Sequence, residues 1–419
     1  MPGFRVWVSL LFAAALGIRL AANAAPPPLT GDAVSHEAKA LSLLQGRGYA
    51  MEGTLTSFKP PGYPAFLAIL YGVFGHDHRA VVWVQSLLGA LTCLIVVAIG
   101  GRLGFPLWGL AGGAFAAIAP SLVRGCGLLV TETLATFLLA LSVWLALACW
   151  QDRKLWQAAG WGVSLGLLAL TRSVMVGLPL CWWTVAWLRT RRMESDHRVL
   201  PRRLALGLLL AVGLIGAWTW RNWTVHRAFV LVSTDGGRAF YASYRPPDGY
   251  RFGLNANDAL AQRAERISSE IERERFYYAA TWAWLRAHLG EVPRLVLLKF
   301  AYLGSPWDWE LIGRDGQARY NWLYGITVPF ALIGVWLLRR RAEAQWALVP
   351  AGYVLLMTAV FYGSPRFRLP IEPHLLLLAS IGLGWVFQRV ASWKVRTGVV
   401  AADLASNALL IAAVRVLRG

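Results

Sequence analysis

The chain has 419 residues, of which 57% are hydrophobic and only 15% are charged. Soluble domains are about 45–50% apolar and about 25% charged, so this composition excludes an ordinary soluble protein and indicates a membrane protein. The formal net charge of +19 does not indicate nucleic-acid binding, because most of the basic excess lies between hydrophobic segments and orients them in the bilayer.

The first apolar segment, Val6–Ala25, is predicted to be a membrane helix. Arg5 precedes this run and Ala22-Asn23-Ala24 ends it, which is the pattern of a cleavable signal peptide. Arg19 interrupts the run shortly before that point and favours a retained helix. The first large polar segment, Pro26–Arg79, follows.

Nine further apolar segments are long enough to span a bilayer. They run approximately over Ala80–Gly100, Phe105–Val123, Gly127–Trp150, Leu155–Leu170, Val174–Leu188, Leu204–Trp220, Trp322–Leu338, Trp346–Tyr362 and Ile371–Phe387. A last apolar stretch, Val399–Leu417, contains Asp403 and Asn407, so it is either an eleventh span or an interfacial helix. The predicted fold is an all-α polytopic bundle in residues 1–390, followed by a tail at 391–419.

The second large polar segment, Arg221–Asn321, contains a predicted helix from about Asp258. Asn257 or Asp258 would cap this helix, and Pro293 lies near its end. Its apolar face would comprise Leu260, Ala264, Ile267, Ile271, Tyr278, Trp282, Leu285 and Leu289. This face is expected to pack on the protein or on the membrane surface rather than to contact substrate. Val292–Leu303 is apolar but too short to span, so it is expected at the interface.

Basic residues orient the predicted helices. They gather in the segment Arg189–Arg203, at Arg339-Arg340-Arg341, at Arg153-Lys154 and at Arg102. An alternating path with the N-terminus inside puts all of them in the cytoplasm and puts both large polar segments outside. We therefore expect a multi-pass protein of the plasma (inner) membrane with its site facing the periplasm or the cell exterior.

Several basic residues lie on the outer side of this map, against the usual bias. They are Arg19, Lys59, Arg124, Arg172, Arg221, Arg366 and Arg368. A single outer arginine is commonly an interface anchor. Several on different loops indicate an anionic ligand at the outer membrane surface, such as a lipid phosphate.

Two acidic residues complete the predicted site. Asp32 follows the first span, and Glu132 lies about a turn and a half into the fourth, where a carboxylate must face an aqueous cavity or pair with a cation such as Arg124. A purely structural pairing of Glu132 and a capping role for Asp32 stay open. His76-Asp77-His78 offers two metal ligands, but no third is indicated, so a solvated turn is expected. No cofactor is predicted, although a divalent metal stays possible.

Short motifs occur in a characteristic order along this membrane map. They are Gly31-Asp32, Gly46-Arg47-Gly48-Tyr49, Lys59-Pro60-Pro61-Gly62-Tyr63-Pro64, Thr131-Glu132, Thr171-Arg172-Ser173, Arg221-Asn222, Gly236-Gly237 and Arg366-Phe367-Arg368-Leu369-Pro370. Their order resembles that in GT-C glycosyltransferases of the dolichyl-phosphate-mannose–protein mannosyltransferase type (family 39), which include the bacterial aminoarabinose transferases of lipid A.

This resemblance implies an enzyme that transfers a sugar from a polyprenyl-phosphate donor to a hydroxyl of a lipid, glycan or protein acceptor. The enzyme would contact membrane lipids, and the reaction would invert the anomeric carbon of the sugar. Asp32 would be the general base, and Glu132 would shape the site. The donor phosphate would bind the basic residues Lys59, Arg172, Arg221, Arg366 and Arg368. Further candidates in the site are His36, Glu37, Tyr63 and Arg124.

Two other functions use the same residues differently. A transporter or flippase for an anionic lipid would need the basic cluster but no chemistry. Transporters usually show paired halves with helices broken at the midplane, whereas this chain has two large outer segments and its charges at one face. A non-catalytic scaffold would leave Asp32 and Glu132 without a role. The sequence therefore favours the enzyme.

Overall fold

The structure is a computed structural model, and it describes residues 3–191, 199–244, 258–308 and 319–389. These residues are mostly helical, and their only strands form two short antiparallel pairs. The pairs are β1 (Ala50–Met51) with β2 (Thr54–Leu55), and β3 (Trp307–Asp308) with β4 (Arg319–Tyr320). The apolar stretch Val399–Leu417 lies outside the described residues.

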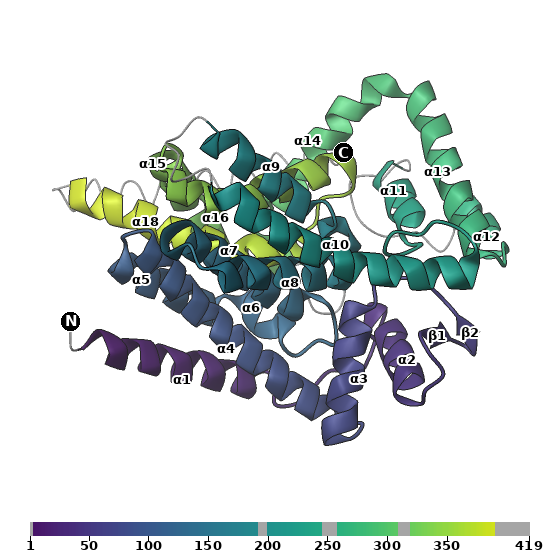
Figure 1. Cartoon of the computed structure of the whole chain (residues 1–419), viewed down its shortest axis with the longest axis horizontal. Coiled ribbons are helices and arrows are strands. Elements are labelled where there is room, and N and C mark those ends of the chain that lie inside the picture. The colour runs from purple at the N-terminus through teal and green to yellow at the C-terminus, as the bar shows by residue number, and fades with distance from the viewer. Residues whose placement is uncertain (1–2, 192–198, 245–257, 309–318, 390–419) are drawn as a thin grey trace.

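All ten predicted spans coincide with helices, which lie side by side in one bundle (Figure 1). The helices are α1 (Phe4–Ala22), α4 (His78–Arg102), α5 (Pro106–Ile118) with α6 (Pro120–Gly125), α7 (Glu132–Asp152), α8 (Leu155–Thr171), α9 (Leu178–Thr190), α10 (Val199–His226), α15 (Trp322–Leu338), α16 (Ala342–Val360) and α18 (Glu372–Arg389). In the described residues, five helical stretches are long and apolar enough to cross a membrane, and four apolar helices are shorter. The predicted polytopic all-α fold is confirmed.

Small residues let several of these helices touch backbone to backbone. A methyl group added to Gly162 of α8 would lie 1.9 Å from the carbonyl oxygen of Gly207 in α10. One added to Gly334 of α15 would lie 2.1 Å from the carbonyl oxygen of Leu378 in α18. Membrane helices associate without a hydrophobic driving force, so such close packing is a main source of their attraction.

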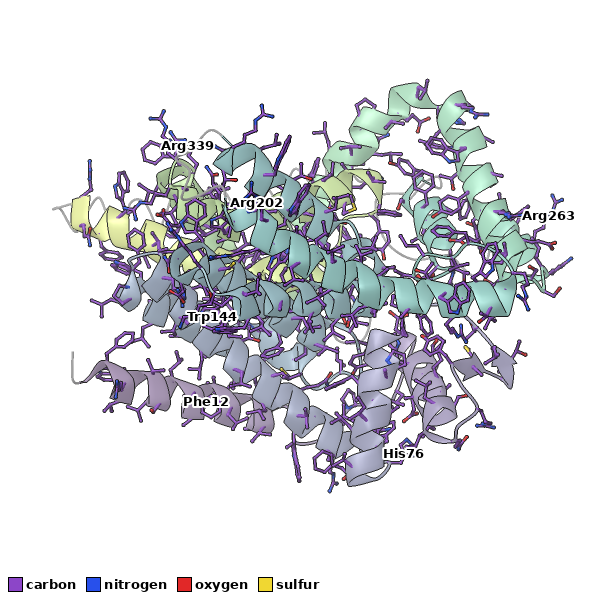
Figure 2. All side chains as sticks on the ribbon, in the orientation of Figure 1. Phe12, His76, Trp144, Arg202, Arg263 and Arg339 are labelled. Carbon is purple, nitrogen blue, oxygen red and sulfur yellow. The ribbon has the colours of Figure 1, made fainter. Side chains whose placement is uncertain are left out.

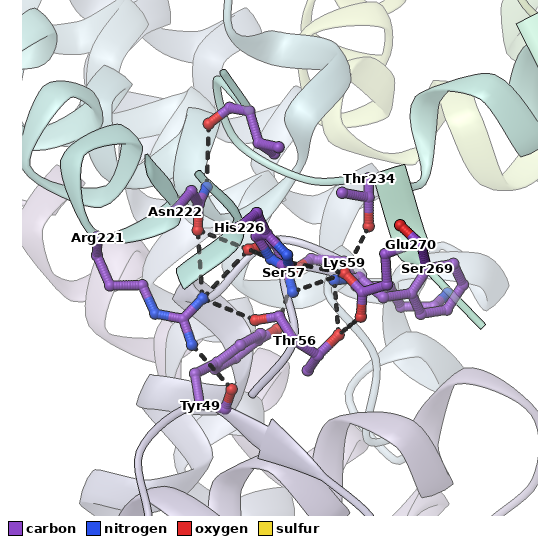
Figure 3. A network of polar contacts seen from close by, with 12 residues as sticks. Tyr49, Thr56, Ser57, Lys59, Arg221, Asn222, His226, Thr234, Ser269 and Glu270 are labelled. Atoms are coloured by element: carbon purple, nitrogen blue, oxygen red, sulfur yellow. Dashed lines mark hydrogen bonds and ion pairs between the residues drawn. The ribbon is translucent and has the colours of Figure 1, made fainter. Parts of the chain in front are cut away.

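The two large polar segments lie together at one end of the bundle (Figure 1). The first forms α2 (Asp32–Leu44), the β1–β2 pair and α3 (Gly62–Phe74). The second forms α11 (Gly236–Tyr244), α12 (Ala259–Glu265), α13 (Glu270–Ala287) and α14 (Val292–Leu303). Glu270 joins the two, because its carboxylate accepts hydrogen bonds from the Thr56 hydroxyl and, at 3.0 Å, from the backbone N–H of Ser57 (Figure 3).

The single helix predicted from about Asp258 is wrong in its extent. Asp258 does cap α12, since its side chain accepts hydrogen bonds from the N–H groups of Leu260 and Ala261. The chain then breaks, and Ser269 caps a new helix, α13. The predicted apolar face is therefore not continuous, and Trp282 is 52% exposed. Pro293 lies in the first turn of α14 instead of ending a helix, because the N–H that proline lacks would have no partner within the helix at this position.

The described residues of the basic loops meet at the opposite end of the bundle, and residues 192–198 of the predicted loop Arg189–Arg203 lie outside the described residues. Arg102 makes two hydrogen bonds to the carboxylate of Asp152, at 2.8 and 3.2 Å. Arg203 donates to the carbonyl of Arg153, and so joins the start of α10 to the end of α7. In Figure 2 Arg339 lies toward the left side of the molecule and Arg263 lies at its right end. The basic loops are thus separated from the large polar segments, as the predicted alternating path requires.

Candidate active site

A cavity of about 670 Å³ lies where the two large polar segments cover the end of the bundle. Both segments and the adjacent helix ends contribute to its wall. Its acidic, basic and histidine lining residues are Asp32, His36, Lys59, Arg172, Asp235, Glu274 and Arg366. Five of the predicted site residues therefore face one space, although they are far apart in the sequence: Asp32, His36, Lys59, Arg172 and Arg366.

Five residues form a continuous charge network at this cavity: Lys59, Asp32, Arg366, Glu132 and Arg172. The Lys59 ammonium lies 2.5 Å from one Asp32 oxygen, and Arg366 Nη2 lies 3.0 Å from the other. Arg366 Nε also pairs with Glu132 Oε1, which Arg172 Nη1 contacts at 3.1 Å. Cations and carboxylates alternate through the network, so each carboxylate is held by two cations.

The backbone around Asp32 and Lys59 is specialised. Asp32 is the first residue of α2 and follows Gly31, whose φ of +55° lies in the region that favours glycine. Lys59 has a φ of +71°, which a side chain with a Cβ rarely adopts. The Tyr49 hydroxyl holds this conformation by donating to the carbonyls of Lys59 and Pro60, at 3.0 and 3.1 Å. Strain retained in this way is typical of functional sites.

Glu132 is fully buried at the first residue of α7 and lies behind the cavity wall. It pairs with a cation, as the sequence predicts, but the partners are Arg172 and Arg366 and not Arg124. Arg172 follows α8, and its guanidinium lies 4.9 Å from the centre of the Phe367 ring. Glu132 thus fixes two arginines whose other faces line the cavity.

The cations around Asp32 keep it ionised. Burial by itself would raise the pKa of this carboxyl, but the charges of Lys59 and Arg366 hold it well below its usual range. His36 lies one turn further along α2, and burial lowers its pKa to about 3. At neutral pH the cavity therefore contains a charged Asp32 beside a neutral imidazole.

Two of the predicted phosphate-binding arginines lie outside the cavity lining. Arg221 donates to the carbonyls of Thr56 and Tyr49, at 2.8 and 3.0 Å (Figure 3). Arg368 is 1% exposed and donates to the carbonyls of Leu303 and Ser305, at 2.8 and 2.5 Å. Both guanidinium groups bind the backbone of the outer segments. We assign them to the architecture of the site and do not retain them as phosphate ligands.

Replacement of Arg368 by alanine is accordingly expected to act on stability. Its Nε lies 3.7 Å from Glu372, which is also 1% exposed and would lose its cation. Leaving a buried charge unpaired typically costs about 3–5 kcal/mol. The Arg368→Ala protein should lose its folded fraction at a markedly lower temperature in detergent, as measured by size-exclusion recovery after heating. An unchanged melting temperature with impaired donor binding would restore Arg368 as a phosphate ligand.

The remaining predicted residues also lie away from the cavity lining. Tyr63 is buried behind His36, with the two rings 5.2 Å apart, and its hydroxyl donates to Gln85 at 2.9 Å. Arg124 belongs to α6 and does not line the cavity. Glu37 points to the far side of α2, where it contacts His76 and His78. The sequence indicates no third ligand and predicts a solvated turn at His76-Asp77-His78, whereas the structure brings Glu37 beside the two histidines as a third potential ligand.

Sequence reasoning missed Asp235 and Glu274, which line the wall contributed by the second outer segment. Burial raises the pKa of Asp235, and burial raises the pKa of Glu274 to about 7. The signal nearest to them is Gly236-Gly237. A methyl group added to Gly237 would lie 2.5 Å from the carbonyl oxygen of Glu274, so these glycines allow α11 to approach α13. Only this packing brings both acids to the cavity.

An apolar groove of about 660 Å³ continues from the cavity between α9 and α10. Four residues line both spaces, namely Val176, Gly177, Phe229 and Leu231. The rest of the groove is formed largely by apolar side chains such as Leu180, Ile215 and Trp223. A molecule with a polar head and a long apolar tail can therefore occupy both spaces at once.

Comparison with known proteins supports one fold. Residues 58–220, which include Lys59, Glu132 and Arg172, match the family model of dolichyl-phosphate-mannose–protein mannosyltransferases. The structure is similar to ArnT from Cupriavidus metallidurans bound to undecaprenyl phosphate, with a TM-score of 0.56, 17% identity, and 94% of this chain and 63% of that chain covered. The chain has the GT-C glycosyltransferase fold.

Two further structures share this GT-C fold, both of the oligosaccharyltransferase of Archaeoglobus fulgidus. The one tethered to an acceptor peptide has a TM-score of 0.57 and 13% identity, with 100% of this chain and 55% of that chain covered. AglB in complex with an inhibitory peptide and a dolichol-phosphate has a TM-score of 0.58 and 12% identity, covering 99% and 55%. A comparison with curated proteins found no significant match.

The GT-C fold confirms the architecture that the ordered motifs predict. The chain spans 63% of the length of ArnT and 55% of the length of AglB. Several helices in the described residues are apolar and long enough to cross a bilayer, so this chain is an integral, multi-pass membrane protein.

Proposed function

We propose that the chain is a membrane glycosyltransferase, which moves a sugar from a polyprenyl-phosphate donor to an acceptor hydroxyl. The observation that carries this proposal is the position of Asp32 on the cavity wall, held between Lys59 and Arg366. One wall thus offers a carboxylate for the nucleophile beside two cations for a phosphate leaving group. A transporter or a scaffold needs no such pairing.

Lys59, Arg366 and Arg172 would bind the donor phosphate. All three line the cavity, and Arg172 and Arg366 are oriented by the buried Glu132. As the bond from the anomeric carbon to the phosphate oxygen breaks, negative charge grows on the departing phosphate. Cations already fixed in place stabilise this charge without reorganisation, which is a major source of catalysis.

Asp32 would accept the proton of the acceptor hydroxyl while that oxygen attacks the anomeric carbon. One displacement forms the new glycosidic bond, breaks the bond to the phosphate and inverts the anomeric carbon. A phosphate that binds Lys59 and Arg366 draws their charges away from Asp32, whose pKa then rises from its depressed value. Donor binding would thereby make Asp32 a better base.

The apolar groove between α9 and α10 would hold the polyprenyl tail. It joins the cavity directly, so the phosphate can meet Lys59 and Arg366 while the tail stays among apolar side chains. The lipids bound in the similar structures support a donor of this class, because ArnT binds undecaprenyl phosphate and AglB binds a dolichol-phosphate. Asp235 and Glu274, which also line the cavity, would accept hydrogen bonds from sugar or acceptor hydroxyls.

The cavity would face the periplasm or the exterior of the plasma (inner) membrane, because the basic loops lie at the opposite end. Two variants test this orientation, Arg340→Cys and Ser268→Cys. Each is made in a protein in which Cys181 is replaced by serine. The other three native cysteines are buried. An impermeant maleimide added to intact cells should label the Ser268 position alone, and labelling of both after lysis is the control. Labelling at position 340 in intact cells would reverse the orientation.

Turnover of donor lipid tests the function. The purified protein, in liposomes with membrane lipid extract, should release free polyprenyl phosphate and form a glycosylated product, both measured by mass spectrometry. The Asp32→Asn protein should bind the lipid but release none. A wild-type protein that moves the lipid between leaflets without cleaving it would instead be a flippase, and the enzymatic proposal would be rejected.

A further inference from the structure

A second group of polar side chains lies outside the cavity, on the far side of α2. His76 in the α3–α4 turn and His78 at the first residue of α4 direct their Nε2 atoms at one oxygen of Glu37, at 2.8 and 2.5 Å. The Tyr71 hydroxyl of α3 lies 3.3 Å from the same oxygen. One ligand atom from each of Glu37, His76 and His78 lies within 4.8 Å of the others.

Aromatic packing fixes the two imidazoles. The ring of His76 lies edge-on to the ring of Tyr71, with 4.8 Å between their centres, and edge-on to the ring of His78, with 5.4 Å between centres. Glu37 is largely buried, whereas about half of the His76 side chain is exposed. The three ligand atoms are therefore gathered in advance on an open rim, which leaves a fourth position for water.

An ion pair alone accounts poorly for this geometry. A carboxylate oxygen has two lone pairs, yet the two imidazoles and the Tyr71 hydroxyl would place three donors on one oxygen of Glu37. A metal ion needs the opposite arrangement, with unprotonated nitrogens and an ionised carboxylate converging on one point. Two histidine nitrogens, one carboxylate and an open position form a donor set that suits zinc.

We propose that Glu37, His76 and His78 form a zinc site on the outer face of the protein. Zinc there ties α2 to the turn between α3 and α4. Glu37 follows His36 directly, and Asp32 begins the same helix, so the ion positions the helix that carries the candidate base. Tyr71, by donating to Glu37, orients the carboxylate toward the metal.

Metal content of the intact purified protein tests the site. The protein, freed of its affinity tag and stripped with a chelator, is equilibrated with buffered zinc, desalted and measured by inductively coupled plasma mass spectrometry. Wild type should retain about one zinc ion per chain, and Glu37→Gln and His78→Ala should retain almost none. Tyr71→Phe keeps the ring packing but loses the hydroxyl, and should weaken zinc binding by roughly 10–100-fold.

His288→Ala is the matched control, because this histidine of the outer segments stacks on Trp284 far from the cluster in sequence and should leave zinc content unchanged. Zinc, but not magnesium, should also raise the melting temperature of the wild-type protein. This measurement does not depend on whether the variants fold. A wild-type protein that retains no zinc, or Glu37→Gln and His78→Ala proteins that retain as much as wild type, would show that the cluster is an ion pair only.

Discussion

The Asp32→Asn protein should transfer sugar at least about a hundredfold more slowly than wild type, because a positioned base typically contributes about 10²–10⁴-fold. Asparagine keeps the size of the side chain but cannot accept a proton at neutral pH. Its neutral amide also frees the charges of Lys59 and Arg366, which contact Asp32 at 2.5 and 3.0 Å. The KM for the donor should therefore stay the same or fall, while kcat falls.

A matched control for Asp32 exists at the opposite end of the bundle. Asp152 pairs with Arg102 at 2.8 Å, so Asp152→Asn also removes a carboxylate from an arginine pair but does so far from the cavity. Its kcat and KM should equal those of wild type. Turnover of Asp32→Asn near the wild-type rate would make Asp32 structural, and Glu274, which also lines the cavity, would become the next candidate for the base.

Replacement of Arg366 by alanine should have the second large effect, a fall of about a hundredfold or more in kcat/KM for the donor. Arg366 is the one residue of the charge network that contacts both Asp32 and Glu132. A lost charge-assisted hydrogen bond costs about 1.5–3 kcal/mol. Removal of the Arg366 side chain also leaves Arg172 as the only cation of the charge network that pairs with the buried Glu132. Donor binding and thermal stability should fall together.

Arg366→Lys separates charge from geometry. Lysine keeps the positive charge but cannot contact two carboxylates with one planar group, so it should recover part of the donor affinity and little of kcat. Arg102→Ala is the control, because it removes an arginine from an exposed pair at the other end. Normal donor affinity in a folded Arg366→Ala protein would remove Arg366 from the phosphate site.

Much of the architecture could be predicted from the sequence, because the bilayer allows few solutions. Backbone groups in hydrocarbon must be satisfied within the segment, so an apolar run of about 20 residues can only be a helix. All ten predicted segments are helices for this reason. The same constraint makes ionisable residues near helix ends conspicuous, and it singled out Asp32, Lys59, Glu132, Arg172 and Arg366, which meet in one network.

Tertiary structure alone decided what each outer charge contacts. Arg366 and Arg368 are two residues apart and chemically identical, yet one lines the cavity and the other binds backbone carbonyls, because successive helical positions point in different directions. Glu37 meets His76 and His78 only because α2 packs on α3, and Asp235 and Glu274 line one cavity only through the close approach of α11 to α13. Hydrophobic pattern fixes which segments are buried in the bilayer, but contacts between residues distant in the sequence arise from packing, which that pattern does not encode.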